Sequence, residues 1–376
     1  MDMIKRIVTP NVIRSMRPGK VAVVLGPRQV GKTTLLNQIS DEENGRVLKL
    51  NCDDYDDAAL LTNKTSTELR NLIEPYSMVT ADEVQRIPDI GLTLKKIGDL
   101  KLNTKVIVSG SSSLDISSKV NESATGRLVH FELYPLSMAE LAAATSEREQ
   151  QRLLETRLIY GCYPEVVTDR ANSRDLLMEL TNDYLYKDLF SLGGIKKPGE
   201  LQKLVRALAF QIGSEVSYNE LAQIVGIDKA TVESYIDLLE KCFVIFRLDS
   251  YSRNLRNEIK KGKKIYFLDT GVRNAVISNF NPAELRNDMG ALWENFLIAE
   301  RLKRNSYVRN YAELYFWRNH NQSEIDMIET LDGRMTSFEF KFNTSVKAKQ
   351  PEAFAKSYPD TPFEVINTQN FWSFVK

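Results

Sequence analysis

The sequence is poor in cysteine and contains no long apolar run. Its three cysteines, Cys52, Cys162 and Cys242, lie too far apart for a zinc-binding pattern, and their odd number fits unpaired thiols in a reducing compartment. No apolar segment approaches the roughly eighteen residues that a membrane span requires. The first residues, MDMIKRIVTP, lack the apolar core of a signal peptide. We therefore expect a cytoplasmic protein with structural cysteines and no membrane partner.

Net charge is also absent. Fifty basic residues balance fifty acidic ones, so any contact with nucleic acid must come from a local patch and not from an overall field. A chain of 376 residues that is 43% hydrophobic can bury more than one core. About two to three domains are expected on this ground.

The segment LGPRQVGKTTLLNQI, from Leu25 to Ile39, has the composition of a phosphate-binding loop. It follows a short apolar run, KVAVVLG, and continues at helical periodicity, which predicts strand, loop and helix. Backbone N–H groups of such a loop surround a β-phosphate together with the positive end of the helix. The residues expected to bind nucleotide are Gly26, Pro27, Arg28, Gln29, Val30, Gly31, Lys32, Thr33 and Thr34. The alternative is a chance glycine-rich turn.

Chemistry at this loop would come from Lys32 and Thr33. Lys32 is expected to reach the β- and γ-phosphates of ATP, and the Thr33 hydroxyl is expected to ligate Mg²⁺. A second strand, within SMVTADEVQRIPDIG, ends in Asp82 and Glu83. Asp82 would hold the Mg²⁺ hydration shell and Glu83 would polarise the attacking water, unless the two form an acidic pair at a helix start.

Further residues of the same core are Ser109, Ser111 and Arg127. The run TKVIVSGSSS predicts a third strand, after which Ser109 or Ser111 would sense the γ-phosphate or simply begin a loop. Arg127, in ESATGRLVHF, would stabilise transition-state charge in a neighbouring subunit of an oligomer. A surface salt bridge is the alternative for Arg127.

The middle of the chain predicts a winged-helix segment. SYNELAQIVGIDKATVESYIDLLEKCFVIFRLDSY reads as two helices with a glycine-containing turn and then a strand, with Ser217 and Asp228 as N-caps. A helical stripe should be buried, namely Val232, Tyr235, Ile236 and Leu239. The opposite face carries acidic residues, namely Glu233, Asp237 and Glu240, beside Lys229 and Lys241. Such a face suits phosphates poorly, so a spacer or interdomain module is the alternative.

A basic stretch, SRNLRNEIKKGKK, follows that segment. Its cations are Arg253, Arg256, Lys260, Lys261, Lys263 and Lys264. They would meet a nucleic-acid backbone from a wing, or form a solvated charge run.

The C-terminal part holds a second constellation. LYFWRN, SEIDMIETLDG and TSFEFKFN predict consecutive strands, with Glu339 and Lys341 on one face and Asp326 on the strand before. Glu294 lies on the preceding amphipathic helix, ALWENFLIAERLKR. These carboxylates are candidate ligands for a second Mg²⁺ or a Mn²⁺, with Lys341 as the candidate lysine for phosphodiester cleavage. The set resembles the Glu…Asp…Glu-x-Lys arrangement of restriction-endonuclease-like folds. A DNA- or protein-binding platform without cleavage is the alternative.

Several motifs in order resemble one family. GPRQVGKTTL, DEVQRIPD, VSGSSS, TGRLVHFELYPLSMAE and GCYPEVV, followed by YLYKDL, YFLDTGV, WENFLIAERLKR and SEIDMI…FEFKF, are similar to prokaryotic AAA-type ATPases with a C-terminal domain long described as of unknown function. The resemblance covers nearly the whole chain and supports a helical lid after the ATPase core. It implies an α/β fold with a P-loop ATPase core at residues 1–136, a helical lid at 137–199, a winged-helix segment at 200–262 and a nuclease-like α/β domain at 263–376.

Two functions from different classes remain open at this stage. The first is an ATP-hydrolysing AAA-type ATPase that acts on DNA, branched or broken, as a homo-oligomer with ATP and Mg²⁺. The second is a signalling or assembly switch, in which ATP drives assembly and the C-terminal domain binds a protein partner. The basic stretch favours the first function, whereas the neutral net charge and the acidic helix face favour the second.

Overall fold

The chain folds into two compact units. The computed structural model describes residues 4–111, 126–182, 195, 197–252 and 262–376. The first unit comprises residues 1–136 with 241–243, and the second comprises residues 137–240 and 244–376. Within the described ranges, none of the helices combines the length and the apolarity that a membrane crossing requires. The cytoplasmic location stays a prediction.

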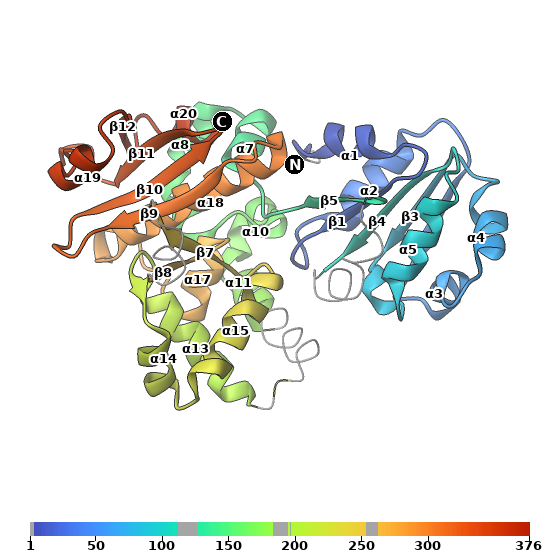
Figure 1. Ribbon diagram of the computed structural model, residues 1–376, viewed down its shortest axis with the longest axis horizontal. Helices are drawn as coiled ribbons and strands as arrows, with labels where there is room; N and C mark the ends of the chain where they lie inside the picture. Colours follow the sequence, from blue (N-terminus) through green and yellow to red (C-terminus); the bar gives the residue numbers. More distant parts are fainter. Residues whose placement is uncertain (1–3, 112–125, 183–194, 196, 253–261) are drawn as a thin grey trace. The chain divides into compact units, whose positions relative to one another are not determined.

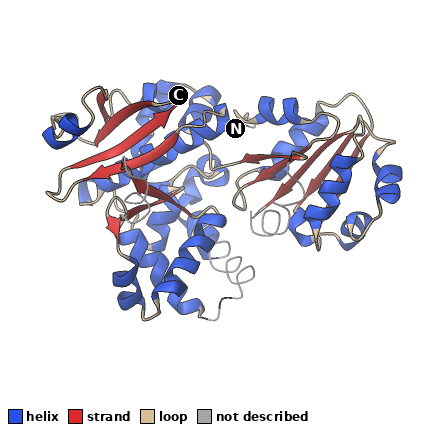
Figure 2. Ribbon diagram, in the orientation of Figure 1, coloured by secondary structure: helices blue, strands red, loops and turns tan. Residues whose placement is uncertain are grey.

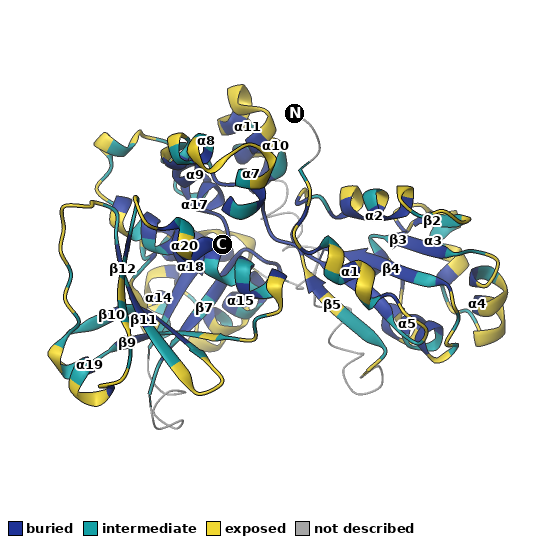
Figure 3. Cartoon of the chain, turned by 90° about the horizontal axis from the view of Figure 1, so that it is seen from above, coloured by how far each residue is buried: buried dark blue, intermediate teal, exposed yellow. Residues whose placement is uncertain are grey.

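The first unit is built on a five-stranded parallel sheet with the order β2-β3-β4-β1-β5 (Figure 1). Its strands are β1 (Val21–Leu25), β2 (Val47–Asn51), β3 (Met78–Asp82), β4 (Lys105–Gly110) and β5 (Leu128–Glu132). Every residue of β1 is buried, as are nearly all of β3 and β4, because a parallel sheet is covered on both faces (Figure 3). The predicted α/β core with a P-loop is confirmed.

Helices surround this sheet (Figure 2). The helices of the first unit are α1 (Thr9–Ser15), α2 (Lys32–Asp41), α3 (Tyr55–Leu61), α4 (Ser66–Ile73) and α5 (Ile90–Asp99). Helix α2 contacts β3 and β4, and α5 contacts β1 and β5. Because α2 begins directly after the loop that follows β1, its N-terminus lies at the carboxyl edge of the sheet, where ligands of open α/β sheets bind.

The second unit contains a seven-stranded mixed sheet with the order β12-β11-β10-β9-β7-β8-β6. Its strands are β6 (Glu215–Val216), β7 (Ile245–Ser250), β8 (Lys263–Phe267), β9 (Glu313–Arg318), β10 (Glu324–Leu331), β11 (Arg334–Lys341) and β12 (Phe363–Asn367). Strands β7 and β8 pair with each other, and β7 also pairs in parallel with β9. The boundary expected between residues 262 and 263 therefore falls inside one continuous sheet.

The second unit also contains helices, some of which pack on that sheet. They are α7 (Met138–Ala144), α8 (Glu147–Arg152), α9 (Leu154–Tyr160), α10 (Pro164–Thr168), α11 (Ser173–Glu179), α13 (Pro198–Phe210), α14 (Tyr218–Val225), α15 (Lys229–Lys241), α17 (Thr270–Val276), α18 (Met289–Val308), α19 (Glu352–Ser357) and α20 (Trp372–Val375). Helices α9 and α11, from the stretch expected to be a lid, both contact α17. That stretch is thus packed into the second unit, and its action as a lid stays a prediction.

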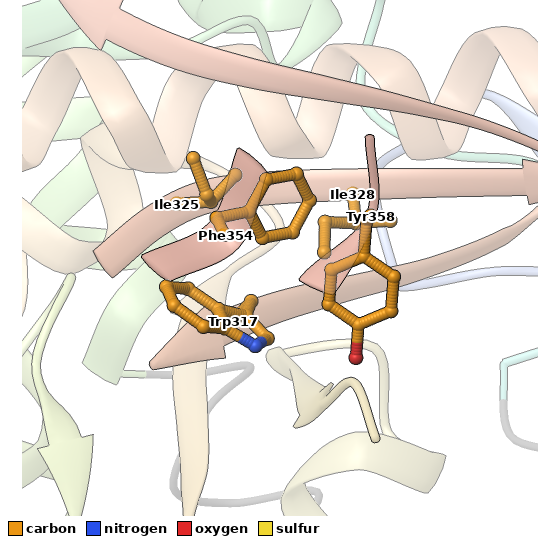
Figure 4. Close-up of a cluster of buried hydrophobic side chains, with 5 residues drawn as sticks. All are labelled: Trp317, Ile325, Ile328, Phe354 and Tyr358. Atoms are coloured by element: carbon orange, nitrogen blue, oxygen red, sulfur yellow. The ribbon is translucent and has the colours of Figure 1, made fainter. Parts of the chain in front are cut away.

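A hydrophobic cluster joins the C-terminal strands to α19. Its members are Trp317, Ile325, Ile328, Phe354 and Tyr358 (Figure 4). The Trp317 and Phe354 rings meet edge to face with their centroids 5.1 Å apart, a geometry that aromatic pairs prefer. This cluster stabilises the end of β9 and the beginning of β10, where candidate site residues lie.

The helices predicted for the middle of the chain are confirmed. Ser217 caps α14, and the Asp228 carboxylate accepts the backbone N–H of Thr231 at 2.9 Å at the start of α15. The predicted stripe on α15 is buried throughout. The elements follow in the order α13, β6, α14, α15, β7 and β8, and these strands belong to the larger sheet, so the winged-helix segment stays a prediction.

The acidic face expected on α15 is largely neutralised. The Arg247 guanidinium, on β7, donates to Asp237 at 2.7 Å and to Glu240. Both carboxylates are half-buried. The face is exposed at Glu233 and partly exposed at Asp237 and Glu240, as the helix pattern predicts. What that pattern did not reveal is the cation that strand β7 presents to two of these carboxylates.

The expected basic stretch divides in the structure. Arg253, Arg256, Lys260 and Lys261 lie outside the described residues. Lys263 pairs with Asp249 at 3.2 Å, whereas the Lys264 side chain is only 1% exposed. The expectation that Lys264 faces solvent or nucleic acid was wrong, because adjacent strand residues point to opposite faces.

Candidate functional site

The P-loop owes its shape to two glycines. A Cβ atom on Gly26 would lie 2.2 Å from the Leu133 carbonyl oxygen, so only glycine fits there. Gly31 precedes α2 with a φ of 95°, in the left-handed region that favours glycine. The loop is also held from the N-terminus, since the buried Arg6 guanidinium donates to the Val30 carbonyl at 2.8 Å and to the Tyr134 carbonyl at 2.5 Å. Sequence reasoning missed Arg6, which has no local signal.

Three strand ends bring the predicted nucleotide-site residues together. Asp82 ends β3 and Ser109 lies in β4, next to the loop after β1. The Thr33 hydroxyl donates to one carboxylate oxygen of Asp82, and the Ser109 hydroxyl donates to the other. A threonine hydroxyl beside a carboxylate at a P-loop is the donor set that holds Mg²⁺ with a nucleotide, so these residues fit that cofactor.

Lys32 lies at the floor of this site. Its side chain is 4% exposed, and its ammonium donates to the carbonyls of Gly26 at 3.1 Å and Pro27 at 2.9 Å. The Glu83 carboxylate is 4.0 Å away. Neutral carbonyl oxygens are weak partners for an ammonium, so Lys32 can exchange them for phosphate oxygens.

Glu83 is held by a residue that sequence reasoning did not single out. Its backbone has a φ of 53°, which is uncommon for a non-glycine residue and turns the chain sharply after β3. The Gln85 amide donates to the Glu83 carboxylate and, at 3.0 Å, to the Ser111 hydroxyl. Of the two serines considered as sensors, Ser109 thus contacts Asp82, and Ser111 is linked to Glu83 through Gln85.

Arg127 lies apart from the nucleotide site of its own chain. It directly precedes β5, which pairs in parallel with β1 from Val21 onward, so it lies at the opposite end of the sheet from the P-loop. Its guanidinium donates to Asp99 at 2.7 Å on the surface. The salt bridge matches the alternative weighed for Arg127, and a role in a neighbouring subunit stays a prediction.

A second cluster forms in the second unit around Glu294, Glu324 and Asp326. One ligand oxygen from each of these residues lies within 4.8 Å of the others. Asn295, fully buried on α18, accepts the Phe267 backbone N–H at 2.8 Å and donates to its carbonyl at 2.7 Å. This bridge docks α18 against β8 and places Glu294 beside Lys264.

Asp326 is aimed by a β-bulge. The register between β10 and β9 shifts between Ile325 and Ile328, and bulges of this kind re-aim a side chain. The Asp326 carboxylate accepts the backbone N–H of Phe340 at 2.7 Å. Burial, with the charges of Glu294 and Glu339 nearby, raises the pKa of Asp326 well above its usual value.

Glu339 and Lys341 lie on the same face of β11, as the strand pattern predicts. The Lys341 ammonium donates to Glu339 at 2.7 Å. Burial opposes the charge on Lys341, but the hydrogen bond and charge of Glu339, with the charges of Asp326 and Glu294, raise its pKa above the usual value. Glu294, Asp326, Glu339 and Lys341 thus lie near enough for their charges to act on one another. The oxygens within 4.8 Å of one another belong to Glu294, Glu324 and Asp326, so a ligand role for Glu339 stays a prediction.

Two members of this cluster were missed in the sequence. Glu324 lies two residues before Asp326, and the period-two pattern of a strand was the signal that could have found it. Lys264 was hidden in a basic run, although its ammonium lies 2.9 Å from Glu294 and also pairs with Glu324. The Tyr266 hydroxyl donates to Glu294 at 2.6 Å from the same face of β8.

One cysteine lies beside the nucleotide site, since the Cys52 backbone N–H donates to the Asp82 carbonyl at 3.0 Å. All three are buried, and none of them is part of a disulfide. Burial, as the largest cause, raises the pKa of Cys52 and of Cys162 to about 12. Thiols with so high a pKa are poor nucleophiles, which agrees with the structural role expected for them.

Family models match three successive stretches of the chain. Residues 18–142 match the model described as an AAA domain. Residues 151–283 match a domain of unknown function, DUF8612, and residues 289–370 match another, DUF4143. The AAA match contains the P-loop, Asp82 and Ser109, while the second cluster lies mostly in the DUF4143 match.

Relatives of known sequence extend over most of the chain. An uncharacterized protein of Mycobacterium tuberculosis is 26% identical over 333 residues, which are 87% of this chain and 71% of that protein. An uncharacterized protein of Haemophilus influenzae is 25% identical over 311 residues, 77% of this chain and 76% of that protein. The chain is thus similar to these bacterial proteins over most of its length.

Solved structures with a detectable likeness include a replication initiator and a branch migration motor. The replication initiator DnaA bound to AMPPCP and single-stranded DNA is 19% identical, with a TM-score of 0.27 over 62% of this chain and 86% of that one. The Holliday junction branch migration motor RuvB of Thermotoga maritima is 16% identical, with a TM-score of 0.30 over 69% of this chain and 88% of that one. The assignment of the core rests on its sheet order, its P-loop and the AAA match.

Proposed function

We propose that this protein binds and hydrolyses ATP, with Mg²⁺ as its cofactor. The observation that carries the proposal is the Asp82 carboxylate, which receives the hydroxyls of Thr33 and Ser109 directly beside the P-loop. Hydroxyl and carboxylate oxygens are the ligands that Mg²⁺ prefers, and this geometry needs no large rearrangement. When bound, the ion supplies charge neutralisation for the phosphates.

The chain's own residues divide the remaining work. Consecutive backbone N–H groups of the loop and the N-terminus of α2 bind the phosphates. Lys32 exchanges its carbonyl partners for phosphate oxygens, and Glu83 orients and deprotonates the attacking water. Gln85 holds the Glu83 carboxylate and links it to Ser111.

We further propose that ATP turnover is coupled to DNA. The element order from α13 to β8 and the basic stretch between β7 and β8 support this proposal. Arg247 supports it as well, because its pairing with Asp237 and Glu240 reduces the negative charge of a helix face that would repel phosphates.

One assay tests the coupling. ATP turnover of the full chain is measured alone and with single-stranded, duplex and four-way-junction DNA at the same ionic strength. We expect at least one DNA form to raise the rate severalfold. An identical rate under every condition would contradict the DNA role and favour a switch that binds a protein partner through its second unit.

A homo-oligomer completes the proposal. Arg127 lies at the sheet edge away from its own P-loop, where a neighbouring copy's nucleotide would meet it in a ring. Mixing Arg127→Ala with Lys32→Ala protein should restore part of the ATPase rate that neither variant shows alone. If mixed assemblies form and no rate returns, Arg127 acts only through its surface pair with Asp99.

A second candidate function belongs to the second unit. The convergence of Glu294, Glu324 and Asp326, with Glu339 and Lys341 on the adjoining strand, favours metal-dependent phosphodiester cleavage. Carboxylates of this kind would hold Mg²⁺ or Mn²⁺, which activates a water, while Lys341 would stabilise negative charge on the phosphate. Incubation of labelled linear and junction DNA in Mn²⁺ tests it, and absence of cleavage under all metal conditions would leave a binding platform.

A further inference from the structure

Lys264 lies inside the carboxylate cluster. Its side chain is 1% exposed, and its ammonium is 2.9 Å from a Glu294 oxygen and paired with Glu324. Those two residues are also members of the group whose oxygens lie within 4.8 Å of one another. The ammonium therefore shares with any metal ion the same pair of carboxylates.

The surroundings keep the ammonium there. Lys264 lies on β8, which is flanked by β6 and β7, and its ammonium is 5.5 Å from the centroid of the Phe316 ring. The Tyr266 hydroxyl, two residues along the same face, donates to Glu294 at 2.6 Å. Because the side chain is enclosed in this way, we expect the ammonium to stay beside the carboxylates when a metal ion arrives.

The neighbouring lysine makes the contrast clear. Lys263 points to the other face of β8, pairs with Asp249 at 3.2 Å and is 32% exposed. The two lysines are neighbours on one strand and carry the same charge, but their side chains lie on opposite faces of the sheet. Of these two, Lys264 alone contacts candidate metal ligands.

We propose that Lys264 is the resident cation of this cluster and sets its affinity for divalent metal ions. This inference rests on the metal site of the second candidate function. An ammonium and a divalent ion held by the same carboxylates repel each other, and the repulsion between charges about 4 Å apart is strong in a partly buried site. The cluster therefore stays assembled without metal and binds a metal ion weakly.

The same repulsion couples metal to a phosphate-bearing ligand. A phosphodiester brings negative oxygens that offset the added positive charge, and it completes the coordination shell of an ion such as Mg²⁺. Metal and phosphodiester then each raise the affinity for the other, by the same factor. Because of Lys264, the cluster thus binds a metal ion more tightly when a phosphodiester is present than when it is absent.

The test measures Mn²⁺ binding to the full chain without nucleotide, from the electron paramagnetic resonance signal of free Mn²⁺. Wild type, Lys264→Gln and the matched control Lys263→Gln are compared, and Asp326→Asn defines the binding that belongs to this cluster. Glutamine keeps an amide that donates to Glu294 and Glu324 but removes the charge. We expect Lys264→Gln to bind Mn²⁺ more than about tenfold more tightly than wild type, and Lys263→Gln to match wild type within about twofold.

Equal or weaker Mn²⁺ binding by Lys264→Gln would overturn the proposal, because Lys264 would then only hold the carboxylates in place. Should Lys264→Gln fail to fold, Lys264→Met supplies a second uncharged variant. Wild type supplies a further check, since it must bind Mn²⁺ at this site more weakly than about 0.1 mM. Tighter binding by wild type would also overturn the proposal.

DNA cleavage by the same proteins separates this inference from the candidate function. Tighter Mn²⁺ binding by Lys264→Gln without cleavage by any protein supports the resident cation and rejects the nuclease. Cleavage by wild type with unchanged Mn²⁺ affinity in Lys264→Gln rejects the resident cation and keeps the nuclease.

Discussion

Two nearly buried lysines, Lys32 and Lys264, lie in the two clusters of this protein and have opposite partners. Lys32 donates to two neutral carbonyls of the P-loop, with the Glu83 carboxylate 4.0 Å away. Lys264 pairs directly with two carboxylates. An ammonium that donates to neutral carbonyls keeps a net positive charge that can attract an anion. The charge of an ammonium between two carboxylates is already neutralised. The first site is therefore prepared for an anion, and the second holds its own cation.

The two sites also differ in how the chain assembles them. The P-loop, Asp82 and Ser109 all lie at the carboxyl ends of adjacent parallel strands, so the strand order alone brings them together. The carboxylate cluster draws on α18, β8, β10 and β11, and it needs a bulge to aim Asp326. A site of the first kind tolerates change at a distance, but one of the second kind depends on the packing of the whole sheet.

The largest expected effect breaks the first site. Lys32→Ala should reduce ATP turnover by more than about a hundredfold, because it removes the ammonium that is expected to reach the β- and γ-phosphates. Lys49→Ala, which removes an exposed lysine paired with Asp41, serves as the control and should keep the wild-type rate. Turnover by Lys32→Ala near the wild-type rate would mean that nucleotide binds elsewhere.

The next prediction separates binding from hydrolysis within that site. Glu83→Gln should keep ATP affinity within about threefold, because Thr33 and Asp82 are unchanged, while turnover falls by about two orders of magnitude. Fluorescent nucleotide binding and phosphate release provide the two measurements. Glu74→Gln, at an exposed pair with Arg70, is the matched control. Normal turnover in Glu83→Gln would assign the water-orienting role to another group.

The third prediction addresses the second site alone. Asp326→Asn should abolish any Mn²⁺-dependent DNA cleavage and leave ATP turnover in the absence of DNA unchanged, since the ATPase residues lie in the other unit. Asp332→Asn, in the hairpin turn between β10 and β11, is a matched substitution that suits its positive φ. Cleavage that persists in Asp326→Asn would come from a different site or from a contaminant.

The smallest effect concerns an ion pair that belongs to neither site. Arg301 on α18 donates to Glu329 on β10 at 2.9 Å, in a position about 10% exposed. Glu329→Gln should lower the free energy of unfolding by about 2 kcal/mol, because Arg301 is left buried without its carboxylate. Urea denaturation measures this free energy. The control variant is Glu352→Gln, because the Glu352 side chain is 92% exposed. The Mn²⁺ affinity of Glu329→Gln should equal that of wild type, whereas that of Lys264→Gln should not.

The same pair predicts a dependence on pH. Burial opposes ionisation of Glu329, but the hydrogen bonds and charge of Arg301 outweigh it and lower the pKa below the usual 4.5. A lowered carboxyl pKa contributes stability above the unfolded value, and that contribution is lost as pH falls through the folded value. The stability difference between wild type and Glu329→Gln should therefore shrink below about pH 4. A difference that stays constant down to pH 3 would contradict the role of the charge.

Local patterns were enough for part of this protein. The spacing of Gly26, Gly31 and Lys32 and the strand before them predict a P-loop, because a phosphate-binding turn is made by consecutive residues. The N-caps Ser217 and Asp228 and the buried stripe of α15 follow for the same reason, since a helix's partners lie within four residues. Period two likewise placed Glu339 and Lys341 on one face of β11.

The tertiary structure alone decided which distant groups meet. Arg6 reaches the P-loop across 24 residues and Arg247 neutralises α15, and neither contact leaves a trace in local spacing. Lys264 lies in a basic run of the sequence, yet strand alternation points its side chain away from solvent. The contact of Asn295 with Phe267 places α18 so that Lys264 pairs with Glu294. Sequence determines charge and periodicity, but the electrostatic role of a charge depends on the groups around it, and the packing of α18 on the sheet selects those groups.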